Sequence, residues 1–380
     1  MNEFILKTKI YMGEYSCKKM QELPIKKPFI ICDPFIVESG KIALVTKLFD
    51  EKQVPYGVFS KVIPDPTVTV VGEAIKELKE FMPDTIIAYG GGSALDTAKA
   101  VGYIYTQMEN CAKIPLMAIP TTSGTGSEVT SFAVISDPAT ESKIPLVSDE
   151  MIPDVAFLDP ALTLTVPPSI TADTGIDVFT HAIEAWVSTR AQDFSDANAL
   201  HAMRILWKNL EQTVKHGDDI QARMHMHHAS CLAGIAFNAA GLGICHSMAH
   251  ALGARFHISH GRSNGMLLPH VMRYNANFEA PNNVTLKRYA EVAAMLGVGG
   301  FGEQSQASML VSQITKMKQK IGIPLTVQEL GIDPPEFLAA IPEMAAKAMA
   351  DQCTQSNPRV PKVEDLEAIY RELLGETRLR

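Results

Sequence analysis

The first 160 residues alternate short apolar runs with segments of helical pattern. The runs PFIICD, YGVFS and DTIIAY are separated by IVESGKIALVTKLFDEKQ and VTVVGEAIKELKEF. Strand–helix–strand alternation of this kind favours a parallel sheet wrapped by helices, with right-handed crossovers. The sequence therefore predicts an α/β, Rossmann-like N-terminal domain.

The pattern changes from about Thr171 onward, where β-branched runs thin out and apolar residues recur at helical spacing. Examples of this spacing are Leu310, Ile314, Met317 and Ile321. A proline-rich stretch, residues 153–172, separates the two patterns. A chain of 380 residues has the length of two domains. We expect an α/β domain over 1–165 and an all-α domain over 166–380.

Composition and charge exclude several classes of protein. The formal net charge of −8 offers no basic surface to a nucleic-acid backbone, so nucleic acid is not an expected partner. The opening MNEFILKTKIYMG has an early acidic residue and only a short apolar run, and no later stretch has the length of a membrane span. The six cysteines have no paired spacing, which is typical of reduced thiols. We expect a cytoplasmic protein with no membrane partner.

One carboxylate and three imidazoles form a candidate metal site. Asp177 and His181 are four residues apart in TGIDVFTHAIEAW, a spacing that puts both side chains on one face of a helix. His246 and His250 have the same relation in GICHSMAHALGARFHISHG, and His260 is expected beyond the helix end, in a glycine-containing loop. Any one of these histidines, taken alone, is also consistent with a solvated or hydrogen-bonded side chain. Together, Asp177, His181, His246 and His260 indicate a divalent ion.

That ligand set is typical of a catalytic metal. One aspartate and three neutral imidazoles leave a net positive charge and an open coordination position. The ligand types suit Fe(II) or Zn(II), and zinc would outcompete iron if both were freely offered.

A glycine-rich turn follows the apolar run DTIIAY. Residues Gly90, Gly91, Gly92 and Ser93 lead directly into a helical pattern, where glycines permit close approach of an anion to the backbone and to the helix N-terminus. This favours a pyrophosphate site. The alternative is a plain strand–helix turn in which Ser93 and Asp96 form a capping pair.

Two further segments suit a nucleotide. The stretch PTTSGTGSE, residues 120–128, is dense in hydroxyls that can bind phosphate or ribose, although such clusters also occur in ordinary surface loops. Asp33 ends the first apolar run, where a carboxylate could accept from ribose hydroxyls and repel a 2′-phosphate, or simply form a turn. Because this acidic residue precedes the glycines, the strand topology cannot be that of the usual dinucleotide fold.

Taken together, these segments resemble the iron-containing (group III) alcohol dehydrogenase family along nearly the whole chain. The matching motifs are TKIYMG, YGGGSALDTAKA, IPTTSGTGSEVT, KIPLVS, PDVAFLDP, TGIDVFTHAIEAW, GICHSMAHALGARFHISHG and CTQSNPR, in this order. Within the family the chain looks closest to the branch of lactaldehyde reductases, propanol dehydrogenases of bacterial microcompartments and aldehyde–alcohol dehydrogenases.

The resemblance implies a dehydroquinate synthase-like fold, NAD as cofactor and Fe(2+) as metal, with Zn(2+) as the alternative. It implies that the four residues named above are the metal ligands and that His250 is a catalytic proton-relay residue. The residues it implies for the cofactor are Asp33, Gly90, Gly91, Gly92, Ser93, Thr121, Thr122, Thr125 and Lys143. Those it implies for the substrate pocket are Phe132, Phe237 and Cys353.

We therefore expect a metal-dependent alcohol dehydrogenase or aldehyde reductase that acts on a small primary alcohol or aldehyde of the propanol or lactaldehyde kind. A homodimer or higher homo-oligomer is expected, with the interior of a microcompartment as an alternative location. Three other functions stay open. A dehydroquinate synthase-type lyase would require more cations than Lys143 and Arg255 provide. The others are a reductase of an anionic aldehyde such as sulfoacetaldehyde, with Arg255 as anion partner, and a non-catalytic assembly element.

Overall fold

The computed structural model describes residues 3–139, 142–280 and 283–375. The chain divides into two compact units, Ile5–Thr165 and Val166–Arg380, and the second also includes Met1–Phe4. We call them the sheet unit and the helical unit and describe each separately.

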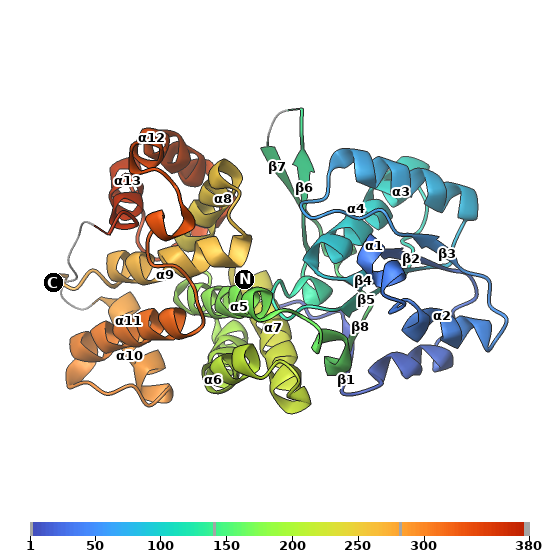
Figure 1. Cartoon of the computed structure of the whole chain (residues 1–380), viewed down its shortest axis with the longest axis horizontal. Coiled ribbons are helices and arrows are strands. Elements are labelled where there is room, and N and C mark those ends of the chain that lie inside the picture. The colour runs from blue at the N-terminus through green and yellow to red at the C-terminus, as the bar shows by residue number, and fades with distance from the viewer. Residues whose placement is uncertain (1–2, 140–141, 281–282, 376–380) are drawn as a thin grey trace. The chain divides into compact units, whose positions relative to one another are not determined.

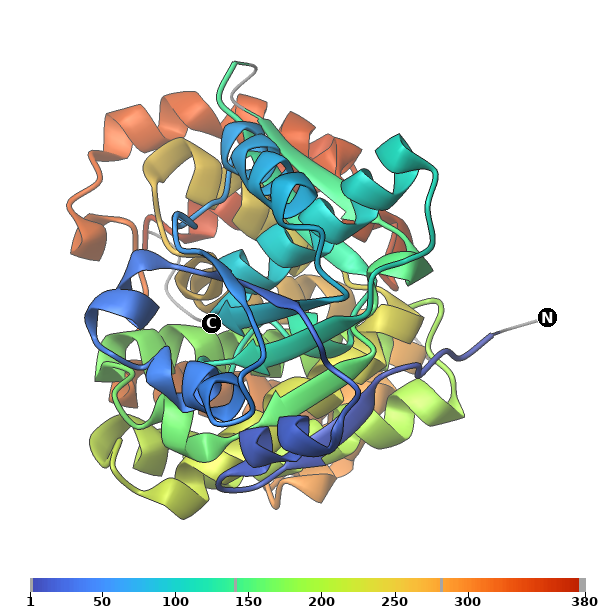
Figure 2. The same cartoon turned by 90° about the vertical axis from the view of Figure 1, so that its right-hand side faces the viewer.

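The sheet unit is built on a parallel sheet of six strands among the described residues (Figure 1 and Figure 2). The strands are β1 (Lys9–Met12), β2 (Pro28–Cys32), β3 (Gly57–Phe59), β4 (Thr85–Gly90), β5 (Leu116–Pro120) and β8 (Val155–Leu158). Their order is β1-β8-β5-β4-β2-β3, and every neighbouring pair is parallel. The prediction of a parallel α/β domain is therefore confirmed, with an order that differs from the usual dinucleotide fold.

Alternate residues of the central strands enter two separate apolar cores, as strand geometry requires. Ile31, Ile86 and Ala118 pack on one face and their neighbours Ile30 and Ile87 on the other. The first face is covered by α3 (Val68–Phe81) and α4 (Gly92–Glu109), and the second by η1 (Ser16–Glu22), α1 (Pro34–Glu38) and α2 (Ala43–Asp50). Strands buried on both faces account for the continuous apolar runs in the sequence.

The segment IVESGKIALVTKLFDEKQ differs from the single helical pattern expected for it. It forms α1 and α2 with a break between them, and Gly40 in that break has a φ of +73°. A left-handed residue cannot continue a right-handed helix, so the chain turns here.

The remaining elements of the sheet unit lie at its loops. They are η2 (Ser127–Val129), η3 (Asp149–Met151), η4 (Pro160–Thr163) and an antiparallel hairpin formed by β6 (Phe132–Asp137) and β7 (Ser142–Val147).

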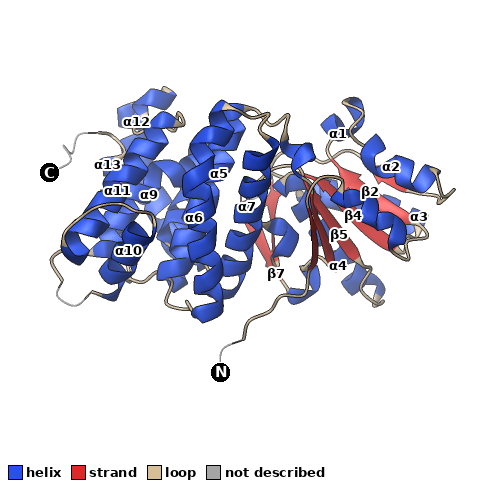
Figure 3. Ribbon diagram, turned by 90° about the horizontal axis from the view of Figure 1, so that it is seen from below, coloured by secondary structure: helices blue, strands red, loops and turns tan. Residues whose placement is uncertain are grey.

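The helical unit contains no strand among its described residues, in agreement with the all-α prediction. Its helices are α5 (Pro168–Val187), α6 (Asp193–Lys215), α7 (Ile220–Ala240), α8 (Ile244–Phe256), α9 (His260–Ala276), α10 (Val284–Met295), α11 (Gly302–Lys320), α12 (Pro334–Ala350) and α13 (Val363–Glu372), with η5 (Gln328–Leu330) and η6 (Gln352–Ser356). Helix α5 packs against α6, α7 and α9 (Figure 3). Every residue from Gly175 to Val187 is buried, so α5 is the central helix of the unit.

Among the described residues, no single helix has the length and apolar character needed to cross a membrane, although α7 and α8 together, bent by 108°, meet those criteria by length and composition.

Candidate metal centre and nucleotide site

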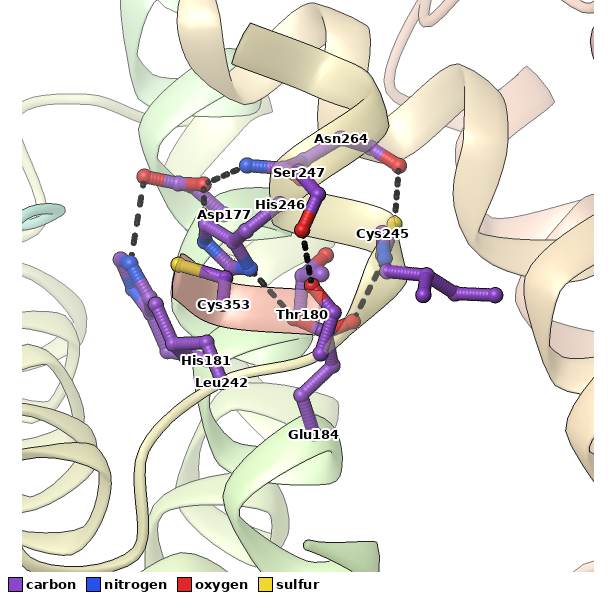
Figure 4. Close-up of polar contacts among 12 residues, drawn as sticks. Asp177, Thr180, His181, Glu184, Leu242, Cys245, His246, Ser247, Asn264 and Cys353 are labelled. Atoms are coloured by element: carbon purple, nitrogen blue, oxygen red, sulfur yellow. Dashed lines mark hydrogen bonds and ion pairs between the residues drawn. The ribbon is translucent and has the colours of Figure 1, made fainter. Parts of the chain in front are cut away.

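The four predicted metal ligands converge from three helices of the helical unit. Asp177 and His181 lie one turn apart on α5, His246 lies on α8, and His260 begins α9. Their donor atoms all lie within 4.8 Å of one another. Figure 4 shows Asp177 between His181 and His246, with the three side chains directed toward one another.

The spacing of these donors fits a shared divalent ion. Asp177 oxygens lie 3.5 Å from His260 Nε2, 3.6 Å from His246 Nε2 and 3.9 Å from His181 Nε2. These separations are too long for hydrogen bonds, whereas tetrahedral ligands about 2.1 Å from one ion lie about 3.4 Å apart. The buried Nε2 of His246 has no hydrogen-bond partner among the described residues. A buried nitrogen that has no hydrogen-bond partner and faces a carboxylate is the arrangement expected of a metal ligand.

The charges of the site also call for a cation. Burial alone would raise the pKa of Asp177, but the charges of His181 and His260 outweigh it and hold that pKa well below its ordinary value. Burial alone would lower the pKa of His246, but the charge of Glu184, the hydrogen bond between Nδ1 and Glu184, and the charge of Asp177 raise it to about 9. Asp177 thus stays ionised and favours positive charge beside it, which a divalent ion supplies.

Glu184 supports the site, and the sequence reasoning missed it. Its Oε2 lies 2.5 Å from His246 Nδ1, and its Oε1 accepts a hydrogen bond of 2.7 Å from the backbone N–H of Cys245. A carboxylate on the far ring nitrogen fixes the orientation of a metal-binding histidine. The signal was present, because Asp177, His181 and Glu184 follow an i, i+4, i+7 pattern along one face of α5.

Asn264 is a second supporting residue that the sequence reasoning did not identify. Its Nδ2 donates a hydrogen bond of 2.7 Å to Asp177 Oδ1 and lies 3.2 Å from His260 Nε2. Asn264 and His260 are one turn apart on α9, so their spacing could have identified Asn264 from the sequence.

The expectation that His260 lies in a loop was wrong, because His260 is the first residue of α9. The following residue, Gly261, is used for close helix packing. A Cβ at Gly261 would stand 2.0 Å from the carbonyl oxygen of Asp173, on α5. Glycine therefore allows α9 to approach α5 closely enough for His260 to reach Asp177.

His250 lies next to the metal ligands without belonging to their group. Its ring stacks on that of His260 with centroids 5.3 Å apart. Its Nδ1 lies 2.7 Å from Oδ2 of Asp351, a residue that the sequence reasoning did not single out. Asp351 caps η6 by accepting a hydrogen bond of 2.8 Å from the backbone N–H of Cys353. The hydrogen bond from Cys353 thus fixes the Asp351 carboxylate, and the carboxylate in turn orients the imidazole of His250.

The predicted pocket residues divide between the units. Phe237 stacks on the ring of His181 at 4.5 Å, and Cys353 lies with His250 and Asp351. Phe132 belongs to the sheet unit, at the start of β6. Arg255, considered earlier as an anion partner, pairs with Glu336 at 3.0 Å and lies over the ring of Phe256.

Of the predicted cofactor residues, Asp33 and the turn from Gly90 to Ser93 lie at the carboxyl ends of β2 and β4. From β2 the chain continues to β3 on one side, and from β4 to β5 on the other, so these strands flank the topological switch point. Ligands of open parallel sheets bind in the crevice at such a point. Asp33 directly follows β2, and a Cβ at Gly90 would stand 3.1 Å from Asp33 Oδ2. The other Asp33 oxygen caps α1 through the N–H of Ile36.

The glycines and the threonines of this region are neighbours. A Cβ at Gly91 would stand 3.4 Å from Thr122 Oγ1, and one at Gly92 would stand 2.6 Å from Thr125 Cγ2. Thr121 donates its backbone N–H to the carbonyl of Gly90 at 2.9 Å. In the described chain no side chain caps the N-terminus of α4, so its N–H groups stay available to an anion.

Ser93 and Asp96 do not form the capping pair considered above. Asp96 instead accepts hydrogen bonds from Ser127 Oγ at 2.7 Å and from the N–H of Val134 at 3.0 Å. One turn along α4, Lys99 donates to Thr130 Oγ1 at 3.1 Å, and burial lowers the pKa of Lys99 to about 8. Helix α4 therefore anchors the threonine-rich loop through the partly buried Asp96 and the buried Lys99.

Lys143, expected near the nicotinamide ribose, lies on β7 and pairs with Asp65 at 2.6 Å. It is 37% exposed.

Comparison with known proteins gives matches for both parts of the chain. Residues 7–160 match the model of the iron-containing alcohol dehydrogenases, and residues 171–374 match that of the Fe-containing alcohol dehydrogenase family, C-terminal. The chain belongs to the iron-containing alcohol dehydrogenase family. It is 41% identical to the 1-propanol dehydrogenase PduQ of Salmonella typhimurium, over 98% of this chain and 100% of that protein.

Solved structures also match this chain over nearly its full length. A 1,3-propanediol oxidoreductase has a TM-score of 0.91 and 32% identity and matches 98% of this chain and all of its own. The sulfoacetaldehyde reductase of Bifidobacterium kashiwanohense, solved with NAD+, has a TM-score of 0.86 and 28% identity, covering 99% of this chain and all of its own. The protein is therefore an enzyme of alcohol and aldehyde oxidoreduction, as the sequence motifs predicted.

Proposed function

We propose that this enzyme transfers hydride between NAD(H) and a small primary alcohol or aldehyde, with a divalent metal as Lewis acid. The observation that carries the proposal is the buried Asp177 carboxylate, with three histidine Nε2 atoms 3.5 to 3.9 Å from its oxygens. The relatives named for 1-propanol and 1,3-propanediol support the substrate class.

In this proposal Asp177, His181, His246 and His260 hold Fe(2+), or Zn(2+) as the alternative. When bound, the ion polarises the substrate oxygen, and NAD(H) carries the hydride. A catalytic ion can expand from four to five ligands, which would leave a position for substrate beside these four residues. Glu184 and Asn264 orient the ligands through His246 Nδ1 and Asp177 Oδ1.

Proton transfer is assigned to His250, because a coordinated ligand cannot act as a general base. The hydrogen bond to Asp351 fixes His250 through Nδ1 and leaves Nε2 to exchange a proton with water or substrate. Phe237, against the ring of His181, provides an apolar wall for a short carbon chain. Cys353 is proposed to border the same pocket, and Phe132 stays a predicted residue of the substrate pocket.

In the sheet unit, the free N–H groups at the start of α4 and the glycines before them are proposed to bind the pyrophosphate of NAD. This role falls to Gly90, Gly91, Gly92 and Ser93, with Thr121, Thr122 and Thr125 lining the nucleotide. Asp33 is proposed to bind the adenosine ribose and to favour NAD over NADP, because its charge repels a 2′-phosphate. Lys143 is proposed to reach the nicotinamide ribose by leaving its exposed pairing with Asp65.

An uncharged substrate is favoured over an anionic aldehyde. Arg255 is already paired with Glu336 at 3.0 Å, so its charge is compensated within the chain. A lyase of the dehydroquinate synthase type, which handles a sugar phosphate, is disfavoured for the same reason.

The test is an assay of metal-loaded protein with NADH and acetaldehyde, propanal, lactaldehyde, butanal or sulfoacetaldehyde, followed by NADH absorbance. Metal-free protein is the control. We expect metal-dependent oxidation of NADH, faster with propanal and lactaldehyde than with sulfoacetaldehyde. Turnover of sulfoacetaldehyde alone would contradict the substrate class, and no turnover of any aldehyde would contradict the function.

We also propose a homo-oligomeric assembly and a cytoplasmic location, as expected from the sequence. Light scattering on the purified protein and fractionation of the source cells test these two points.

A further inference from the structure

A second group of donor atoms lies in the helical unit and shares no residue with the metal centre. It consists of His250 on α8, Asp351 at the start of η6, and Cys353 within η6. One donor atom from each lies within 4.8 Å of the other two. The set combines an imidazole, a carboxylate and a thiol.

We propose that His250, Asp351 and Cys353 form a second cation site, which takes a thiophilic divalent ion such as Zn(2+). Imidazole nitrogen, carboxylate oxygen and thiolate sulfur are the three donor types that zinc uses in proteins. A thiolate donor sets this site apart from the Asp177 centre, whose donors are only nitrogen and oxygen.

The geometry places Asp351 at the middle of the group. Its Oδ2 lies 2.7 Å from His250 Nδ1, while its other oxygen accepts the backbone N–H of Cys353 at 2.8 Å. The carboxylate is therefore already oriented between the two other donors. Ligands to one ion lie about 3.4 Å apart, so an ion requires only a small separation of the His250 and Asp351 side chains.

The binding step balances as an exchange of protons for a cation. Bonds form from the ion to His250 Nδ1, to an Asp351 oxygen and to Cys353 Sγ. The proton of the Cys353 thiol is released to solvent. The proton that His250 Nδ1 shares with Asp351 is also released, while Nε2 takes one from water, so that the imidazole stays neutral. No oxidant or reductant takes part.

The exposure of the side chains and the charge of the donors both permit a cation to bind at this second site. The side chains of His250 and Asp351 are 31% and 21% exposed, so an ion from solution can reach them. One carboxylate and one thiolate neutralise a divalent ion. A neutral second site limits repulsion between the two ions. They would be close, because the ring of His250 stacks at 5.3 Å on that of His260, a proposed ligand of the first ion.

The consequence for catalysis rests on the proposed function. An ion on His250 Nδ1 takes the place of the hydrogen bond to Asp351 and holds the imidazole that we assign to proton transfer. Zinc beyond one equivalent is therefore expected to inhibit the enzyme.

Titration of the metal-free protein with Co(2+) tests the site directly. The first equivalent should give only the weak visible bands of a nitrogen and oxygen site. Further Co(2+) should produce an intense near-ultraviolet thiolate-to-cobalt band, and this band should be absent in Cys353→Ser. Cys111→Ser, which removes an exposed cysteine elsewhere in the chain, is the matched control and should keep the band.

Equilibrium dialysis gives the second readout. Cys353→Ser and Asp351→Asn should each weaken the second binding step by at least about tenfold, since loss of a ligand exceeds loss of a supporting residue. Zinc inhibition, measured relative to each variant's own activity, should need correspondingly more zinc. Absence of a thiolate band in the wild type, or its survival in Cys353→Ser, would overturn the proposal.

One further variant separates this site from the proposed catalytic centre. His260→Ala should weaken the first phase of the titration and leave the thiolate band. A thiolate band that appears with the first equivalent of Co(2+) and disappears in His260→Ala would show one mixed site, and would overturn the second site. Loss of the first phase without loss of activity would instead overturn the proposed function alone.

Discussion

The metal centre and the nucleotide site are built in opposite ways. In the helical unit, long helices carry charged side chains into a buried point, where Asp177 is 3% exposed and His246 is 1% exposed. In the sheet unit, the site is formed where side chains are missing, at Gly90 to Gly92, and where backbone N–H groups are uncapped. One site depends on which side chains are present, and the other on which are absent.

The residues that position the two sites also differ. Around the metal centre, Glu184 and Asn264 bind the ligands themselves and set their orientation. Around the nucleotide site, Asp96 and Lys99 do not face the glycines but hold the neighbouring loop through Ser127 and Thr130. Substitutions should therefore affect metal and nucleotide separately.

The largest effect is expected from His260→Ala. Removal of one of four ligands should give metal well below one equivalent and activity lower by roughly 10³-fold, because Lewis-acid stabilisation is worth several kcal/mol. NADH affinity, measured by fluorescence titration, should not change. His225→Ala, an exposed histidine on α7, is the control. Wild-type activity of His260→Ala in metal-free buffer would disprove the ligand assignment.

His250→Gln should retain metal and lose activity by roughly 10²-fold, since a positioned proton-transfer group contributes at least that much. Added imidazole should restore part of the activity by replacing the missing ring. Metal analysis alongside the assay is decisive. Lost metal would make His250 a ligand, whereas full activity would make it a packing residue.

Glu184→Gln keeps the shape of the side chain but removes the charge that faces His246 Nδ1. We expect metal affinity to fall roughly 10- to 100-fold, as for other residues that orient metal ligands. Competition with a coloured chelator measures this affinity. An unchanged value would show that Glu184 only accepts the backbone hydrogen bond of Cys245.

Gly92→Ala tests the proposed nucleotide site of the sheet unit. Its Cβ would stand 2.6 Å from Thr125 Cγ2, so NADH affinity should fall about tenfold, because overpacking costs ~1 to 3 kcal/mol. Metal content should stay at the wild-type level. Gly72→Ala on α3 is the matched control, since no atom of the described chain lies within 4 Å of its added Cβ. Equal NADH affinity of the two variants would contradict the proposed pyrophosphate position.

The smallest effect is expected from Asp33→Asn. This change removes the charge but keeps an oxygen that can cap α1 through Ile36. Use of NADPH relative to NADH should rise about fivefold or less, since one partly exposed charge is worth ~1 kcal/mol or less. The ratio of kcat/KM for the two cofactors measures it. An unchanged ratio would remove Asp33 from the ribose site.

The sequence predicted more of the metal centre than of its surroundings. Asp177 and His181 could be paired in advance because a helix fixes the relation of residues four apart. Glu184 and Asn264 follow the same rule, and a search for the next position along each helix face would have found them. Asp351 could not be found this way, because it reaches His250 across a chain separation of 101 residues.

The nucleotide site shows where local patterns mislead. Ser93 and Asp96 have the spacing of a capping pair, yet Asp96 bonds to Ser127 and Val134. Those partners come close only because β4 and β5 are adjacent and the chain after β5 folds back over α4. A local rule cannot foresee a stronger, buried partner from elsewhere in the chain.

The sequence by itself determined the change from strand–helix alternation to helices, the glycine turn and the ligand spacing within α5, because these depend on backbone geometry over a few residues. Tertiary structure alone decided that His260 begins a helix, that α9 meets α5 at Gly261, and that Asp351 faces His250. These outcomes depend on how closely distant helices can pack, and that distance is set by side chains far apart in the chain.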